Sequence, residues 1–423
     1  MREALASLTT RGRAFLAAGV TAVVCAVVLG QPALTRVGVL LVALPLATAV
    51  LLGRTRYRLS LVRSVQPGLV RAGQPARVSV TVSNEGRTRS GVLLMEDHVP
   101  YVLGSRPRFV VDGAGPGWRR EISYQVRSDV RGRHDIGPMT VRIGDAFGLV
   151  ELGRAFRTTS RLVVTPRTVT LPDVPLGGGS SGAGENRPRA AATGSAEDVT
   201  VREYRRGDDL RRVHWPSSAR VGELMVRREE QPWEARASVL LDHRLVSHRG
   251  DAAAGSLEDA VSAAASVVEH LARRGFALRL VTTDGTTVET ARRRQGTVGD
   301  PSALLEALAV VAADHSPSLH GPGVLEHTGG GITVAVLGDV TDADLGTWRR
   351  VAGRSSLALA VVLDVDAWTG SGTPGDEPSD EARLRAGRLE HAGWRAAVLT
   401  PGGGLADVWR ELGRARTRTG RAS

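Results

Sequence analysis

The sequence VREYRRGDDLRRVHW, residues 201–215, is where the pattern of the chain changes. It sets Tyr204, His214 and Trp215 among acids and arginines, a mixture that neither a buried strand nor an amphipathic helix needs. Before it, apolar residues alternate along short segments. After it, longer apolar runs alternate with helical patterns. The stretch therefore separates two kinds of domain, and we name the segment around it, residues 199–234, the signature arm.

The residue spacing in this arm is that of a family signature. A tyrosine is followed by a Gly-Asp pair, then by His-Trp and by Ala-Arg. With RGRHDIGP (131–138) and DAFGL (145–149) earlier in the chain, the arm resembles domain-of-unknown-function family 58. This resemblance implies a membrane-anchored bacterial protein with a von Willebrand A-like domain, and it implies no particular reaction. We assign to the signature or docking set Arg202, Tyr204, Gly207, Asp208, Arg211, His214, Trp215, Ala219 and Arg220.

Three roles for the arm stay open. Its arginines and acids fit an internal ion network that clamps the arm onto the neighbouring domain. Tyr204 and Trp215 fit the anchors of a docking surface, and the arginines together with His214 fit an anion site. The pattern also predicts a short helix that Gly207–Asp209 caps and that Pro216 ends. No nucleophile stands at a spacing that would make His214 catalytic.

The composition favours a folded protein without nucleic acid as a partner. The 423 residues carry a formal charge of +11, and every basic residue is arginine. The arginines are spread along the chain, and aromatic residues make up only 4%, too few for repeated base stacking. A chain without lysine has no Gly-x-x-x-x-Gly-Lys phosphate loop. We therefore expect no ATP hydrolysis and no cofactor.

Two apolar runs near the amino terminus, Ala14–Gly30 and Val37–Leu52, contain no charge. Each is close to the length that a helix needs to cross a bilayer, and the second run argues against a cleaved signal peptide. Arginines flank the outer ends of both runs, whereas the turn at Gln31–Arg36 has one. By the positive-inside rule, residues 1–58 form a two-helix membrane anchor in contact with lipid, and the main body lies in the bacterial cytosol.

Short strands follow the anchor. Alternating or short apolar runs predict strands at Arg77–Ser83, Val92–Met95, Glu121–Val126, Thr140–Ile143 and Leu162–Val164. Frequent turns between them, without a helical period, predict an all-β sandwich over residues 59–175. The glycine-rich residues 176–198 predict a flexible linker before the signature arm.

Residues 235–414 alternate apolar strands with amphipathic helices. This alternation predicts an α/β domain with a Rossmann-type parallel sheet that helices cover on both faces, followed by a basic tail at 415–423. The expected strands are Ala237–Asp242, Ala277–Thr282, Ile332–Leu337, Leu357–Leu363 and Ala396–Leu399. The expected helices are Leu257–Arg274, Ser302–Ala313, Asp342–Ala352, Glu381–Ala392 and Leu405–Leu412.

Such sheets bind ligands at the carboxyl ends of their strands, where Asp242 and Asp339 follow two of them. The von Willebrand A resemblance implies a metal site there, with an Asp-x-Ser-x-Ser loop, a threonine and a later aspartate. The loop in this chain reads DHRLV (242–246), so both serines are lost, and Thr297 fits only loosely. An arginine can replace an ion beside two aspartates. We expect a degenerate site around Asp242, Arg244 and Asp339 that holds no metal.

These features predict a multi-pass membrane protein with two spans that acts as a cytosol-facing, non-enzymatic interaction or adaptor protein. The family resemblance implies a MoxR-type AAA+ ATPase as its protein partner in envelope or complex assembly. One alternative is a hydrolase or transferase acting at the signature, which would lose turnover on changing Asp208 or His214. The other is a membrane-tethered nucleic-acid binder, which would bind DNA with a steep salt dependence.

The arginine asymmetry predicts the topology of the anchor. Reporters fused after Ser60 and at the carboxy terminus should both read as cytosolic, and a reporter within Gln31–Arg36 should read as external. The measurement is the activity of compartment-specific reporter fusions in cells. A carboxy terminus on the external side would contradict the two-span hairpin.

Overall fold

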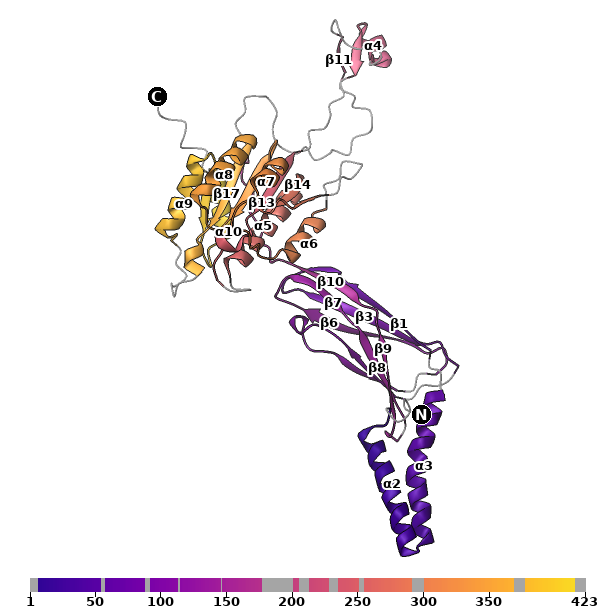
Figure 1. The fold of residues 1–423 in the computed structure, drawn as a ribbon. Helices are drawn as coiled ribbons and strands as arrows, with labels where there is room; N and C mark the ends of the chain where they lie inside the picture. The colour runs from indigo at the N-terminus through magenta and orange to yellow at the C-terminus, as the bar shows by residue number, and fades with distance from the viewer. Residues whose placement is uncertain are drawn as a thin grey trace. The chain divides into compact units, whose positions relative to one another are not determined.

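The structure is a computed structural model with two compact units, Met1–Pro166 and Arg167–Ser423 (Figure 1). It describes residues 7–54, 58–87, 92–112, 115–145, 147–176, 201–204, 213–227, 235–250, 255–290, 300–368 and 377–414. The predicted tail at 415–423 and nearly all of the predicted linker lie outside these residues. Each unit has its own buried core, so we describe each by itself.

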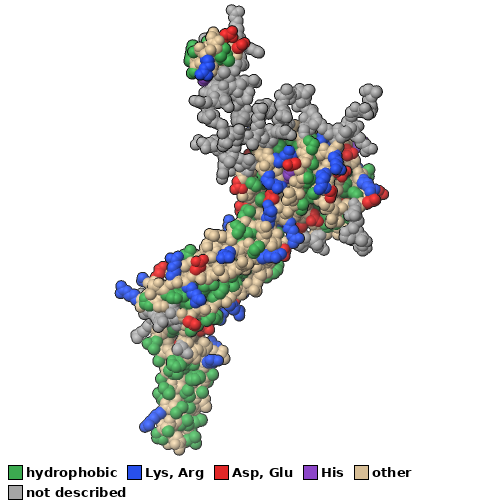
Figure 2. Space-filling view, turned by 180° about the vertical axis from the view of Figure 1, so that it is seen from behind, with side chains coloured by type: hydrophobic (Ala, Val, Ile, Leu, Met, Phe, Trp, Pro, Cys, Tyr) green, Lys and Arg blue, Asp and Glu red, His purple; other side chains and the backbone are tan. Residues whose placement is uncertain are grey.

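Two helices, α2 (Thr10–Leu29) and α3 (Pro32–Arg54), open the first unit. Both are long and apolar enough to cross a membrane, and only 17% of each apolar window is buried, unlike a core helix. Figure 2 shows the apolar side chains that cover their surface. Glycine at position 19 lets the two helices pack closely, because any larger residue would place its Cβ 2.9 Å from the Gly38 carbonyl oxygen.

The two predicted apolar helices are confirmed, but the predicted turn was too long. Gly30, in the left-handed conformation, ends α2, and α3 already begins at Pro32. Proline suits the first helical position because its φ is preset and it has no N–H to leave unpaired. At the other end, the Thr9 side chain accepts a hydrogen bond from the Gly12 amide, which extends α2 beyond the apolar run.

The rest of the first unit is built of strands. They are β1 (Leu59–Gln66), β2 (Leu69–Arg71), β3 (Pro75–Asn84), β4 (Leu93–Asp97), β5 (Arg108–Val111), β6 (Arg119–Arg127), β7 (Gly132–Ile136), β8 (Met139–Gly144), β9 (Glu151–Phe156) and β10 (Ser160–Thr165). They form sheets of order β1-β3-β6, β2-β10-β7 and β5-β4-β8-β9. The inward residues of these sheets share one core, as in a sandwich, and all the predicted strands are present.

A buried arginine ties the sheets of this unit together. Arg63 on β1 donates to both carboxylate oxygens of Asp97 at 3.1 and 2.6 Å, and their side chains are 1% and 0% exposed. Its third nitrogen donates to the carbonyl oxygens of Ile136 and Thr158. Tyr124 on β6 donates to Asp97 at 2.5 Å, and burial together with this bond raises the pKa of its hydroxyl. Five segments of the chain therefore meet at this one ion pair.

The second unit holds a six-stranded sheet of order β15-β14-β13-β16-β17-β18. Its strands are β13 (Arg236–Leu241), β14 (Ala277–Thr282), β15 (Thr287–Glu289), β16 (Ile332–Leu337), β17 (Leu357–Leu363) and β18 (Arg395–Leu399). The helices are α5 (Ser256–Arg273), α6 (Ser302–Val310), α7 (Gly321–His327), α8 (Asp342–Arg354), α9 (Asp380–His391) and α10 (Leu405–Arg414). Helices α5, α6 and α10 share one core with the sheet, and α7, α8 and α9 share the other (Figure 1).

This architecture confirms an α/β domain and corrects several details. The sheet is not wholly parallel, because β15 pairs with β14 antiparallel at the edge. Helix α6 ends at Val310 rather than Ala313, and α7 was not predicted. Residues 167–175, predicted as part of the sandwich, and Leu176, predicted as the start of the linker, pack instead in the α/β core through Leu171, Val174 and Leu176. Such short apolar segments carry no period that reveals which core they join.

The Arg63 network predicts a large stability effect. Arg63→Ala should lower the free energy of unfolding by about 3–5 kcal/mol, because Asp97 would stay buried without a cation. Chemical denaturation of the purified chain in detergent measures this. Arg161→Ala removes an exposed arginine 4.0 Å from an exposed Asp135 and should change stability by less than about 0.5 kcal/mol. Equal stabilities of the two variants would contradict the structural role of Arg63.

Candidate functional site

The strands of the α/β sheet present polar side chains at their carboxyl ends. From β13 the chain continues to β14 on one side, and from β16 it continues to β17 on the other. The point between β13 and β16 is therefore the reversal point of the sheet, where open α/β sheets bind their ligands. Asp242 follows β13 and Asp339 follows β16, so both predicted acids lie at this edge.

A guanidinium lies between buried carboxylates at this point. Arg244 donates from Nε and Nη2 to the two oxygens of Asp242, at 3.0 and 2.8 Å, and from Nη2 to Asp344 at 3.0 Å. Its side chain is 2% exposed. Burial alone would lower the pKa of Arg244, but the bonds and charges of the two aspartates raise it above its ordinary value. The group is therefore a permanent cation in the place predicted for an ion.

Neighbouring polar groups hold this pair in position. The Thr341 hydroxyl donates to Asp344 at 2.9 Å, and the Thr283 hydroxyl lies 3.4 Å from Asp242. His248 contacts the Asp242 carbonyl oxygen through Nε2 at 2.7 Å, and burial lowers the pKa of its ring. Gly338 allows the loop after β13 to approach, because a Cβ there would overlap the Ser247 carbonyl oxygen.

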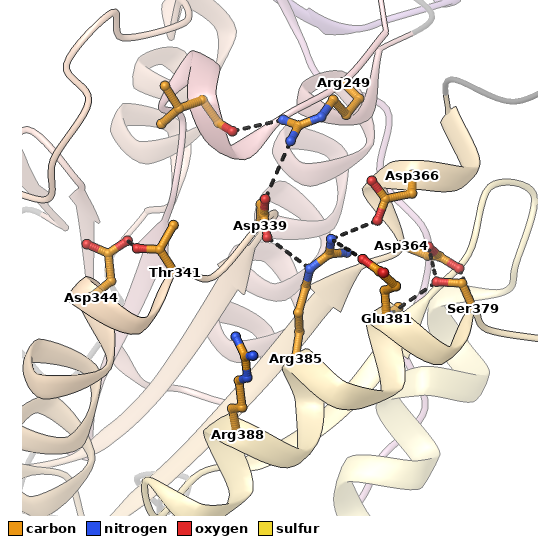
Figure 3. A network of polar contacts seen from close by, with 12 residues as sticks. Arg249, Asp339, Thr341, Asp344, Asp364, Asp366, Ser379, Glu381, Arg385 and Arg388 are labelled. Carbon is orange, nitrogen blue, oxygen red and sulfur yellow. Dashed lines mark hydrogen bonds and ion pairs between the residues drawn. The ribbon is translucent and has the colours of Figure 1, made fainter.

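Asp339 does not join Arg244, which corrects the predicted set. Its oxygens pair with Arg385 at 2.9 Å and with Arg249 at 3.4 Å, in the network of Figure 3. Arg385 also contacts Asp366 at 2.7 Å. The second acid on Arg244 is Asp344, in the first turn of α8. Thr297 lies outside the described residues.

The edge of the sheet thus carries two adjacent ion networks, one buried and one half-buried. Asp242, Asp344 and Asp339, the described carboxylates at the reversal point, each have an arginine partner. Among the described residues, no group of three or more His, Cys, Asp or Glu is arranged to hold a metal ion. Chemically, this edge is suited to holding loops in place, because its charges are neutralised within the chain.

The signature arm forms a small element of its own. Strands β11 (Val201–Glu203) and β12 (Met225–Arg227) pair antiparallel, and helix α4 (Trp215–Val221) lies between them in the chain. Buried Val213 bridges to buried Val226, and the His214 amide donates to the Met225 carbonyl at 2.8 Å. These contacts fix where α4 begins relative to the strands.

His214 caps α4, and the predicted end of a helix at Pro216 was wrong. The His214 ring nitrogen Nδ1 lies 2.8 Å from the Ser217 hydroxyl and accepts from its amide. Pro216 stands in the first turn of α4, where proline is tolerated because that amide has no helical partner. The Ser218 hydroxyl bonds to the His214 carbonyl at 3.0 Å. A capping histidine has a structural role at this position.

The signature residues differ in how exposed their side chains are. Trp215 is 69% exposed, Ala219 and Arg220 are exposed, and Tyr204 is half-buried. Arg202 lies on β11, and Gly207, Asp208 and Arg211 lie outside the described residues. Sequence reasoning missed Asp344, although Thr341 and Asp344 stand at the N-cap and N3 positions of α8, the spacing of a capping pair.

The comparisons with known proteins agree with the signature. Residues 200–329 match the family described as "Protein of unknown function DUF58", a range that includes nearly all of the arm, and Arg244. The "Uncharacterized protein YeaD" of Bacillus subtilis (strain 168) is 26% identical over 229 residues, 50% of this chain and 53% of that protein. The chain therefore spans about half the length of this curated relative.

Solved structures give weaker likenesses. The CARDB domain of a Pyrococcus furiosus protein, in complex with di-metal ions, shows 16% identity over 26% of this chain and 93% of that chain, with a TM-score of 0.20. The putative ApaA protein from Bordetella pertussis shows 12% identity over 26% and 94%, also with a TM-score of 0.20. At these scores neither likeness supports an argument about fold or function.

The buried ion pairs of Arg244 predict a large effect of this residue on stability. Arg244→Met should lower the free energy of unfolding by about 3–5 kcal/mol, because Asp242 and Asp344 would keep their charges without a buried partner. Arg249→Met is the matched control, since its guanidinium is partly exposed and such pairs contribute about 0–1 kcal/mol. Denaturant titration of both variants measures the difference.

Magnesium provides a second readout of the same prediction. Mg²⁺ should not raise the melting temperature of the unmodified chain, because Arg244 fills the position between the carboxylates. A ligand at about 100 times its dissociation constant would add roughly 2.7 kcal/mol, which is easily seen. A Mg²⁺-dependent rise that Asp242→Ala abolishes would contradict the assignment of Arg244 as the ion's substitute.

Proposed function

We propose that this chain, whose residues 200–329 form a DUF58 region, is a membrane-anchored interaction protein and not an enzyme. Its signature arm would bind a protein partner through Trp215. The observation that carries this proposal is the 69% exposure of that tryptophan on the arm. Large aromatic side chains are frequent anchors of protein interfaces.

The arm has the features of a docking element. Its interior is closed by Val213 against Val226 and by backbone bonds between β11 and β12, so the strands stay paired without the indole. Val221 and Leu224 are also exposed, at 59% and 42%, which adds apolar area on the same element. Arg220 supplies a positive charge beside them. A partner would therefore offer an apolar pocket with an acidic rim.

The α/β sheet supports a non-enzymatic role. At its reversal point, where a substrate or metal would bind, the carboxylates are paired with Arg244 and Arg385. A von Willebrand A-like identity for this domain fits the place of Asp242 on the loop after the first strand, and it would be a degenerate example. Recognition would then use surfaces of the domain rather than an ion at its edge.

The proposed location is the bacterial cell membrane, with α2 and α3 as spans and the body in the cytosol. Arginines at the outer ends of both spans support this orientation. The partner class that the family resemblance suggests is a MoxR-type AAA+ ATPase. An oligomeric ATPase with acidic surface pockets would match the chemistry of the arm.

Trp215→Ala should separate docking from internal clamping. If Trp215 is an anchor, its loss weakens partner capture by about 30-fold or more, the effect of losing roughly 2 kcal/mol, and leaves stability within about 0.5 kcal/mol. Quantitative affinity capture from solubilised membranes and thermal denaturation provide the two readouts. Tyr101→Ala, which removes an exposed aromatic residue of the other unit, should leave capture unchanged.

Asp208→Ala completes the comparison. A loss of about 1–4 kcal/mol in stability from this change would show that the arm clamps through its acids. If Trp215→Ala destabilises the chain by a similar amount while capture per folded molecule stays normal, the docking proposal is wrong. If both variants fold normally and capture is unchanged, the anion-site interpretation takes precedence.

A further inference from the structure

The loop between β8 and β9 has a fixed shape that points one side chain outward. The Asp145 carboxylate accepts from the Val150 amide at 2.8 Å and from the Phe147 amide at 3.0 Å. Gly148 adopts a φ of 67°, which suits glycine, and its amide donates to the Asp145 carbonyl. Leu149 and Val150 are buried in the core, whereas Phe147 is 60% exposed. The phenyl ring is thus held away from the core by the loop itself.

The same loop is fixed to the first turn of α2. The Thr9 amide donates to the Leu149 carbonyl at 3.0 Å, and the Thr9 hydroxyl donates to the Gly148 carbonyl at 2.7 Å. At Gly12, a Cβ would overlap the Leu149 carbonyl oxygen, so only glycine permits this approach. The position of Phe147 relative to the start of the apolar helix is therefore set by direct contacts.

We propose that Phe147 inserts into the cytosolic face of the lipid bilayer and acts as an interfacial anchor for the β-sheet unit. The inference rests on the proposed membrane anchoring by α2 and α3. The bilayer is the surface that Phe147 would meet, because the loop is bonded to the start of the first span. Helix α2 begins at Thr10, and its apolar run begins at Ala14. Exposed aromatic and aliphatic side chains at that level bury themselves at the headgroup boundary.

The charges near the loop fit the same occupant. Arg11 and Arg13 are exposed on the first turn of α2, and an Arg11 nitrogen lies 3.8 Å from the Cβ position of Gly148. Guanidinium groups beside an apolar ring match the phosphates and acyl chains of an anionic lipid surface. The anchor would hold the β-sheet unit at a set height and rotation above the membrane.

Tyr101 provides a matched reference position. It is 91% exposed and follows the end of β4, whereas the loop at Phe147 follows the end of β8. Because Leu93 pairs with Ile143 and Asp97 with Met139, the two sites lie at opposite ends of these strands. Strands rise about 3.3 Å per residue, so the reference lies roughly 15 Å or more from the loop along the sheet.

The test uses one thiol at a time in the full chain, reconstituted in vesicles that contain anionic lipid. The native Cys25, exposed on α2, reports on the span itself. Phe147→Cys and Tyr101→Cys, each with Cys25→Ala, report on the loop and on the reference. Each thiol carries an environment-sensitive fluorophore, and lipids with a spin label near the headgroup or near the acyl-chain end serve as quenchers.

We expect the label at 147 to emit at shorter wavelength and to be quenched most by the headgroup-proximal spin label. The label at 25 should be quenched more by the deeper spin label, and the label at 101 by neither. Quenching at 25 without quenching at 147 would overturn the inference and leave the membrane anchor intact. No lipid quenching at 25 would overturn the anchor itself. A shortened wavelength at 147 without lipid quenching would show a protein contact and would also overturn the inference.

Discussion

A guanidinium group that is buried away from water needs hydrogen-bond acceptors around it. Each of the two units of this chain contains one such group, Arg63 and Arg244. Arg63 draws together β1, β4, β6 and the segment at Ile136, and Arg244 joins the loop after β13 to the start of α8. In a chain whose basic residues are all arginine, this constraint has a particular geometry. The planar fork bonds two oxygens at once, so each buried cation fixes the direction as well as the distance of its partners.

The same constraint decides where recognition can occur. At the reversal point of the α/β sheet, Nε and Nη2 of Arg244 bond to the carboxylates of Asp242 and Asp344, and the buried Arg385 pairs with Asp339 and Asp366. Ligand chemistry at that edge would have to displace strong internal pairs. Trp215 on the signature arm and Phe147 on the β8–β9 loop are apolar and exposed. We therefore propose these apolar protrusions, rather than the polar edge, as the surfaces that contact other molecules.

The sequence predicted most elements, because periodicity reports burial and burial is what the two cores require. The runs at Ile332–Leu337 and Leu357–Leu363 became β16 and β17 with the same bounds. The antiparallel edge strand β15 was missed since three residues carry no recognisable period. The loop arginine was identified by its place beside Asp242, but its second partner was not. Pairing across 100 residues depends on helix docking, which no local pattern records.

The bond between Thr9 and the β8–β9 loop joins residues 139 positions apart in the chain. A ribosome adds about 5–20 residues per second, so roughly 7–28 s pass between the synthesis of these two partners. When Gly148 is added, the residues of α2 and α3 have all been made, whereas those of β9 and β10 have not. Under the proposed membrane anchoring, the helices would enter the bilayer before the β-sheet unit closes. The last strands to be made, β9 and β10, thus complete a unit whose β8–β9 loop is bonded to the start of α2.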